Sequence, residues 1–264
     1  MLLKFFWLAA LLNTTPVFAA SFVDNFDGTG QLSETGEMSS SLHPNWWLNS
    51  GGYLYWADGV AGTAQGELVN TDSFRLLYTA SNAVDTDNGY RPQNILRLVT
   101  RPKFKDFTQQ FFFNIQKINL SASPNRNQSN GVLFFHRYQD GDNLYYAGIR
   151  VDGYAIVKKK RFGRYYELKS VPVYPGHYNR DTLPNLIPTN RWIGLKTVIA
   201  DNANGNADIT LYLNDGLLGS GWTKILQVED TGADAERILT EGYAGIRTDF
   251  MDVRFDNYQA TESQ

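Results

Sequence analysis

The amino-acid sequence of 264 residues contains no cysteine. This absence excludes a disulfide framework, a thiolate metal site and a lipoprotein anchor. Long apolar runs are also lacking, since no segment reaches the about 18 consecutive apolar residues of a membrane helix. A protein without disulfides depends on its hydrophobic core, and a chain of this length with 42% hydrophobic residues can form a large one. We therefore expect a single large core and no membrane partner.

The first 19 residues have the pattern of a signal peptide. Lys4 forms a short basic region, residues 5–12 are an apolar run too short to span a bilayer, and Ala19 is the small residue of a cleavage site. We predict that residues 1–19 are removed, that residues 20–264 form a single domain, and that the protein is secreted or periplasmic. The alternative is an N-terminal helix buried in the fold.

Positive charge is scarce outside one central stretch. Residues 91–180 contain 16 Lys and Arg against 5 Asp and Glu, a net charge of +11, whereas the whole chain carries −3. The stretch is also rich in Tyr and Phe, and cations interleaved with aromatic rings suit a polyanion. The alternative is that these charges lie on solvated outer faces of strands. Because we expect export, the sequence predicts an acidic polysaccharide as partner and no nucleic acid.

The chain has no long stretch with helical periodicity after the predicted signal peptide. Short aromatic and β-branched runs alternate with Gly, Asn, Asp and Pro, which predicts an all-β sandwich or barrel. The expected strands cover residues 94–101, 110–118, 131–138, 144–151, 154–160, 192–199, 208–214 and 251–258. Asp152-Gly153 predicts a two-residue turn between two of these strands. Residues 121–130 and 174–189 are predicted to be long loops.

Four segments carry a family resemblance. They are GVLFFHRYQDGDNLYYAGIRVDGYAIVKKK (131–160), RWIGLKTVI (191–199), ITLYLND (209–215) and GYAGIRTDFMDVRFDNY (242–258). In this order they resemble the concanavalin A-like, laminin-G-like jelly rolls. The resemblance implies an all-β fold, a β-jelly roll made as a sandwich of two antiparallel sheets. Lectins, glucanases and the lyases that cut alginate, ulvan and glucuronan share this fold, so the fold alone does not decide the activity.

Two enzyme classes on this fold require different residues. A retaining glycosidase needs two carboxylates about 5 Å apart, and the Glu-x-Asp-x-x-Glu motif that would supply them is absent. A lyase removes the C5 proton beside a uronate carboxylate, and it needs a cation or amide to neutralise that carboxylate, a base and an acid. The central stretch offers Arg, His, Tyr and Lys for these tasks. The sequence therefore favours a lyase that acts by β-elimination.

The predicted turn at Asp152-Gly153 indicates which side chains share a face of the sheet. A two-residue turn places Tyr146 opposite Lys159, on the same face as Arg150. We expect this face to form the wall of the substrate cleft. The run YYAGIR, residues 145–150, resembles a strand of the alginate lyases. This resemblance implies that Tyr146 and Arg150 face the cleft.

The candidate catalytic residues are His136, Tyr146 and Arg97. His136 is the expected base, because it faces Tyr146 if the loop at 140–143 has an odd length; with an even length Arg137 takes that place. The alternative is a histidine that is hydrogen-bonded within the sheet. The arginines of NILRLVTR, residues 94–101, resemble the arginine motif of the alginate lyases. The residues predicted to bind substrate are Arg101, Arg137, Arg150, Lys159 and His177.

The two ends of the chain predict a structural calcium site. Residues 22–28 and 253–257 resemble the paired terminal strands of carbohydrate-binding jelly rolls. This resemblance implies a hard cation held by Asp24, Asp27 and Asp256. In the alternative interpretation these residues only form turns.

The sequence as a whole predicts a secreted monomer that cleaves a uronate-containing polysaccharide, such as alginate, ulvan or glucuronan, by β-elimination. No cofactor is required for this chemistry. The second hypothesis is a lectin-like protein of the same fold that binds carbohydrate without cleaving it. A glycoside hydrolase is the third hypothesis.

Overall fold

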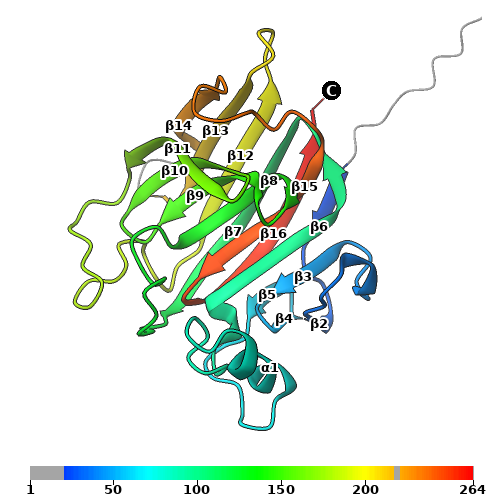
Figure 1. Cartoon of the computed structure of the whole chain (residues 1–264), viewed down its shortest axis with the longest axis vertical. Coiled ribbons are helices and arrows are strands. Elements are labelled where there is room, and N and C mark those ends of the chain that lie inside the picture. Colours follow the sequence, from blue (N-terminus) through cyan, green and yellow to red (C-terminus); the bar gives the residue numbers. More distant parts are fainter. Residues whose placement is uncertain (1–20, 217–220, 264) are drawn as a thin grey trace, which may run out of the picture.

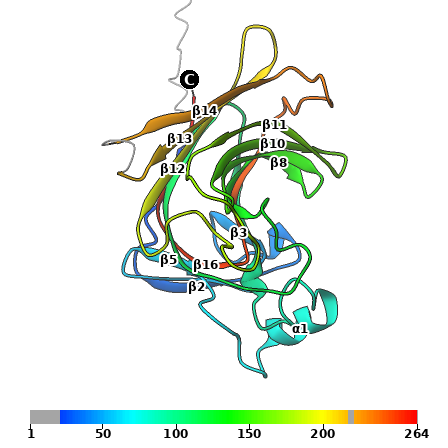
Figure 2. The same ribbon diagram turned by 90° about the vertical axis from the view of Figure 1, so that its left-hand side faces the viewer.

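The computed structural model describes residues 21–216 and 221–263, so the predicted signal peptide lies outside the described residues. Two antiparallel β-sheets face each other and form a sandwich (Figures 1 and 2). The prediction of an all-β jelly roll with two antiparallel sheets is confirmed. Among the described residues, no helix is long and apolar enough to cross a membrane.

The larger sheet of the described chain has nine strands, in the order β14-β13-β12-β7-β16-β5-β4-β2, with β1 paired to β16. Its strands are β1 (Ser21–Asp24), β2 (Thr29–Ser33), β4 (Tyr53–Ala57), β5 (Val60–Thr63), β7 (Phe107–Ile118), β12 (Ile193–Asp201), β13 (Ala207–Asn214), β14 (Thr223–Asp230) and β16 (Met251–Glu262). The smaller sheet has seven strands, in the order β11-β10-β9-β8-β15-β6-β3. They are β3 (Trp46–Ser50), β6 (Ile95–Phe104), β8 (Gly131–Asp140), β9 (Asn143–Arg150), β10 (Tyr154–Arg161), β11 (Arg164–Pro172) and β15 (Gly242–Asp249).

The core lies between the two sheets and follows from alternation along the strands. In β7, Phe107, Phe111 and Phe113 are fully buried, whereas the alternate residues Thr108, Gln110 and Phe112 are half-buried on the outer face. A period of two puts alternate side chains on opposite faces of a sheet. Trp46 of β3 is 1% exposed and closes one end of the core against Phe22 and Tyr258.

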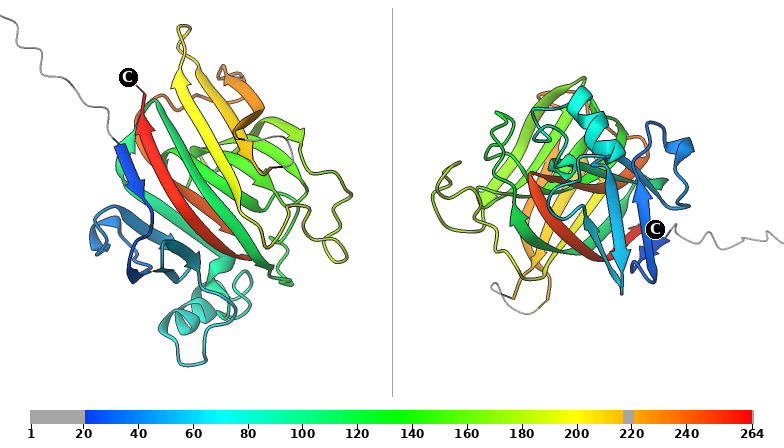
Figure 3. Two further views of the ribbon diagram at one scale, coloured as in Figure 1. Left: turned by 180° about the vertical axis from the view of Figure 1, so that it is seen from behind. Right: turned by 90° about the horizontal axis from the view of Figure 1, so that it is seen from below.

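All eight predicted strands are present, with ends that differ by a few residues. The helical elements were not predicted: α1 (Ser73–Ser81) and the 3₁₀ turns η1 (Met38–Ser40) and η2 (Pro92–Asn94). The side chain of Asp72 accepts hydrogen bonds from the backbone N–H groups of Phe74 and Arg75, at 2.8 and 3.2 Å, and so caps α1. This helix packs at one end of the sandwich (Figure 3, right).

The predicted register between β9 and β10 is wrong by one residue. Tyr146 lies opposite Lys158, and Lys159 lies opposite Tyr145. The turn contains three residues, with Gly153 at a φ of 81°, and not the two that Asp152-Gly153 predicts. Three-residue hairpins commonly end in such a left-handed residue. Because a shift of one residue exchanges the faces, Lys159 points into the core.

The predicted partner of Tyr146 on β8 is also wrong. Phe135 lies opposite Tyr146, and His136 lies opposite Tyr145 on the core side. A bulge follows His136, where Arg137 adopts a φ of 46°. The bulge consumes residues that a simple count along the hairpin assigns to regular pairs.

Candidate functional site

A cavity of about 510 Å³ opens on the outer face of the seven-stranded sheet. Arg97 of β6 and Arg247 of β15 lie opposite each other in register and contribute to its lining. Lys158 of β10 and Tyr165 of β11 line it from the other edge of the sheet. The remaining lining residues are Asp85, Ile95, Asn125, Asn127, Ser129, Asn130, Arg150, Ile156, Glu167, Asp249 and Phe250.

Two tyrosines and three cations pack together beside this cavity. Lys158, Arg247 and Tyr165 line it, whereas Tyr146 is 2% exposed and lies beneath the lining. The ammonium of Lys158 lies 5.1 Å from the ring centre of Tyr146 and 5.2 Å from that of Tyr165. The guanidinium of Arg247 lies 5.3 Å from the Tyr146 ring, and Lys160 lies 5.2 Å from the Tyr165 ring. The two tyrosine rings are 6.0 Å apart. The cluster is a set of cations on aromatic faces, which stabilises cations without neutralising their charge.

Three cations of the cavity lining, Arg97, Lys158 and Arg247, retain donors for an external anion. Among the described residues, the side chains of Arg97 and Lys158 form no ion pair and no hydrogen bond. Arg247 is paired with Asp249 at 2.8 Å, but its Nη1 is buried without a hydrogen-bond partner. A buried donor without an acceptor is costly, so an anion that enters the cavity restores the missing contacts.

The surroundings of Tyr146 and Tyr165 shift the pKa values of the two hydroxyls in opposite directions. Burial raises the pKa of Tyr146 to about 12, against the opposing charges of Arg247 and Arg97. Burial also tends to raise the pKa of Tyr165, but the charges of Arg247 and Lys160 and the hydroxyl of Tyr146 outweigh it, so its pKa is lowered. Two neighbouring groups with pKa values pushed in opposite directions suit an acid and a base. Of the two, Tyr146 holds its proton more firmly and Tyr165 gives its proton up more readily.

Burial also acts on Lys158. It lowers the pKa of this ammonium to about 8, and the positive charges of Arg247 and Arg150 add to the shift. The carboxylates of Asp249 and Glu167 oppose it without cancelling it. Lys158 is therefore still mostly charged at neutral pH, which lies about one pH unit below this pKa.

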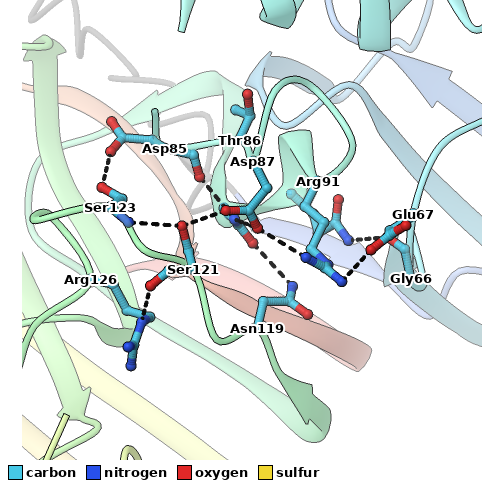
Figure 4. A network of polar contacts seen from close by, with 12 residues as sticks. Gly66, Glu67, Asp85, Thr86, Asp87, Arg91, Asn119, Ser121, Ser123 and Arg126 are labelled. Carbon is cyan, nitrogen blue, oxygen red and sulfur yellow. Dashed lines mark hydrogen bonds and ion pairs between the residues drawn. The ribbon is translucent and has the colours of Figure 1, made fainter. Parts of the chain in front are cut away.

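The opposite wall of the cavity is polar and uncharged except for Asp85. It is formed by the loop between β7 and β8, which a network of hydrogen bonds ties to the segment after α1 (Figure 4). Ser123 donates to Asp85 at 2.5 Å, Ser121 donates to Asp87 at 2.6 Å, and Arg126 donates to the Ser121 carbonyl at 2.6 Å. These contacts fix the loop that supplies Asn125, Asn127 and Asn130 to the cavity lining.

Three of the predicted site residues come together here. Arg97 and Arg150 line the cavity, and Tyr146 lies against its cations. Arg150 is already paired with Asp152 and, at 3.5 Å, with Glu167. Its charge is therefore less available to a ligand than the charges of Arg97 and Lys158.

His136 is placed on the core side of β8 and does not reach the cavity. It is fully buried, and Gln109 Nε2 lies 3.1 Å from its Nδ1. Burial, reinforced by the charge of Arg137, lowers its pKa to about 3. This placement contradicts the predicted position beside Tyr146 and matches the alternative of a histidine bonded within the sheet.

Arg137 and Lys159 are also placed in the interior, which contradicts their predicted positions on the cleft wall. Arg137 is fully buried, with ion pairs to Asp106 at 2.7 Å and Asp201 at 2.8 Å. Lys159 is fully buried and pairs with Asp230 at 2.8 Å. Buried cations of this kind are held by their carboxylates, which leaves no charge for a substrate.

Two further predicted residues lie outside the cavity lining. Arg101 donates to the carbonyl of His43 at 3.0 Å, at the end of β6 away from Arg97. His177 is exposed in the long loop between β11 and β12. The described structure brings neither residue to the tyrosine pair.

The predicted calcium ligands do not form a carboxylate cluster. Asp24 accepts from Phe26 N–H at 2.8 Å and from Trp46 Nε1 at 2.7 Å, so both of its oxygens are used. Burial raises the pKa of Asp256, and the charge of Asp27 adds to the shift. No group of three His, Cys, Asp or Glu side chains that could hold a metal occurs within residues 21–216 and 221–263. The calcium site therefore stays a prediction from the sequence.

Sequence reasoning missed Lys158, Tyr165 and Arg247. Lys158 was assigned to the other face by the error in register. Tyr165 precedes the bulge in β11, which lies between Glu167 and Lys169. Arg247 lies outside the basic stretch, on the strand between β6 and β8. The signal that could have located Arg247 is the run GYAGIR at 242–247, which repeats the YAGIR of 146–150.

No protein-family model and no curated protein matches the chain. Solved structures that resemble it include the carbohydrate-binding module CBM66 from Bacillus subtilis, at 15% identity and a TM-score of 0.45 over 64% of this chain and 82% of that one. A protein of unknown function with a galectin-like fold from Bacillus subtilis has 14% identity and a TM-score of 0.47, over 82% and 88% of the two chains. A β-1,3-1,4-glucanase from a mouse hindgut metagenome has 9% identity and a TM-score of 0.46, over 92% and 98%. These likenesses assign no ligand or reaction to this chain.

Proposed function

We propose that the protein is an exported polysaccharide lyase that cleaves a uronate-containing glycan by β-elimination. The observation that carries the proposal is the cavity lined by Arg97, Lys158, Arg247 and Tyr165, with Tyr146 packed against Lys158 and Arg247. Cations with unused donors suit the uronate carboxylate, and two tyrosines of different acidity suit the proton transfers. The predicted signal peptide supports action outside the cytoplasm.

In the proposed reaction, these residues bind the carboxylate and account for every proton that is transferred. The carboxylate binds to Arg97, Lys158 and Arg247, which stabilise the extra negative charge that develops on it. The Tyr165 phenolate takes the C5 proton, and the electron pair of that C–H bond forms the C4–C5 double bond. The C4–O bond breaks, and the departing oxygen takes the proton of Tyr146. A proton passed from Tyr165 to Tyr146 then restores both residues.

The test is a screen of acidic polysaccharides for the ultraviolet absorbance of an unsaturated uronate product. We expect absorbance to rise with at least one of alginate, ulvan, glucuronan or polygalacturonate, and not with neutral glucans. Binding to one of these polymers with no rise on any of them contradicts the lyase. That result supports the second candidate, a carbohydrate-binding protein, which the cationic lining of the cavity and the ring of Tyr165 also suit.

Arg97→Ala is expected to raise KM for the acidic polymer about tenfold at low salt, because this cation has no carboxylate partner in the described chain. The effect should shrink as salt increases, since charges are screened over about 10 Å at 0.1 M. Arg101→Ala is the matched control, on the same strand but outside the cavity lining. Equal KM values for the two variants at low salt would show that the cavity is not the carboxylate site.

The pKa of Lys158 predicts the pH above which substrate binding weakens. Its folded pKa is lowered to about 8, so its charge is present below that pH and is lost as pH rises through it. We expect KM to rise above about pH 8 in the wild-type protein. In Lys158→Arg the rise should move to higher pH, because a guanidinium stays charged to about pH 12. Steady-state measurements of KM from about pH 6 to about pH 10 test this expectation. Identical pH profiles of KM for the wild type and Lys158→Arg would contradict it.

A further inference from the structure

The outer face of the nine-stranded sheet carries a second lysine held between aromatic rings. Lys196 of β12 lies 4.7 Å from the ring centre of Tyr212 and 4.7 Å from that of Trp222. Phe112 of β7 packs against Trp222 at 5.8 Å between ring centres. Within the described chain, Lys196 forms no ion pair and no side-chain hydrogen bond. This is the arrangement of Lys158 between Tyr146 and Tyr165, on the opposite face of the sandwich.

The register extends this cluster into a row that crosses the sheet. Five residues that pair in succession form it: Gln259, Gln110, Lys196, Tyr212 and Lys224. Strands lie about 4.8 Å apart, so the row spans about 19 Å. It contains two amides, two cations and one aromatic ring, and no carboxylate.

The row is accessible to a ligand. Gln110, Lys196 and Tyr212 are half-buried and Lys224 is exposed. On each of β7, β12 and β13, the residues directly before and after the member of the row are buried in the core. The outer face of β12, β7 and β16 is turned toward the viewer in Figure 3 (left), and no other element of the described chain lies in front of it. Gly194 lets Phe112 and Trp222 approach the strand, since a β-carbon there would come within 2.9 Å of both rings.

We propose that this row is a second binding surface for an acidic polysaccharide, separate from the cavity. Uncompensated cations attract the uronate carboxylates, ring faces stack on the sugar rings, and the glutamine amides bond to hydroxyl groups. A linear chain lies across the strands along the row. The surface shares its ligand class with the proposed function but none of its chemistry, because it has no acid–base pair. Two sites on one molecule raise the affinity for a long polymer more than for a short fragment.

Electrophoresis through gels that contain alginate, polygalacturonate or ulvan tests the proposal, with a neutral β-glucan gel as reference. We expect at least one acidic gel to retard the wild-type protein, and Lys196→Gln and Trp222→Ala to raise the apparent dissociation constant about tenfold. Lys117→Gln is the matched control, an exposed lysine of β7 without an aromatic partner. In the Arg97→Ala background, the remaining retardation should disappear when Lys196→Gln is added.

Several results would overturn the second surface. They are a wild-type protein that no acidic gel retards, Lys196→Gln and Trp222→Ala variants that migrate as the wild type does, and complete loss of retardation in Arg97→Ala alone. Failure of the lyase proposal is a different result. If no polymer yields an unsaturated product while Lys196→Gln still reduces retardation, the second surface stands without the lyase. If a lyase is found, Lys196→Gln should leave kcat on short uronate oligosaccharides unchanged.

Discussion

Tyr165→Phe is expected to lower kcat by about 100-fold or more, the usual contribution of a positioned acid or base. The ring and its contacts with Lys158 and Lys160 remain, so the fold and KM should change little. Only the hydroxyl whose pKa is lowered by Arg247 is removed. Tyr146→Phe should have an effect of similar size, because it removes the proton for the departing oxygen. The double variant should be little slower than either single one, since the two hydroxyls act as a unit.

Tyr166→Phe is the control for this experiment. Tyr166 neighbours Tyr165 on β11, and it lies opposite Lys159, on the other face of the strand. Its variant should keep full turnover. A folded Tyr165→Phe protein with near-normal kcat would remove Tyr165 from the mechanism. If Tyr146→Phe alone were then inactive, Tyr146 would have to serve as both acid and base.

The all-β fold could be predicted because its signals are local. The alternation of β7 and the turn-forming residues that bound each strand are visible within about ten residues of sequence. The helix α1 was missed because it is nine residues long and buries a single residue, Tyr78. Its local signal was the capping residue Asp72 before a short apolar run.

The cavity could be predicted only in part because it depends on pairings between distant segments. Arg97 and Tyr146 follow from residue type and from resemblance. Arg247 reaches the site because β15 lies between β6 and β8. The repeat of YAGIR within residues 242–247 marks this strand as similar to β9, but it does not give the strand's neighbours in the sheet. One extra residue in the turn after Arg150 exchanges Lys158 and Lys159 between cavity and core. The charge of the basic stretch therefore predicted a cationic site, but not which lysine supplies it.

Asp230→Ala is expected to lower the free energy of unfolding by about 3–5 kcal/mol, the cost of leaving a buried charge without its partner. Asp230 is 2% exposed, and its carboxylate accepts from Lys159 at 2.8 and 2.9 Å and from the Tyr145 hydroxyl at 2.6 Å. Without it, the carbonyl of Ala235 is the one acceptor that the Lys159 ammonium keeps within residues 21–216 and 221–263. Urea unfolding followed by tryptophan fluorescence measures the change. Asp234→Ala, an exposed aspartate of the segment after β14, should change stability by less than about 0.5 kcal/mol.

A variant of Lys159, the ion-pair partner of Asp230, tests whether this lysine stabilises the fold or binds substrate. Lys159→Met removes the ammonium and leaves the Asp230 carboxylate with Tyr145 and Gly232 as donors. It should therefore lower stability, and the double variant Lys159→Met/Asp230→Ala should lose less stability than the two single variants together, because the two charges stabilise each other. At a temperature where Lys159→Met remains folded, KM for an acidic polysaccharide should equal that of the wild type. A Lys159→Met protein with wild-type stability and a raised KM would instead place this lysine in the substrate site.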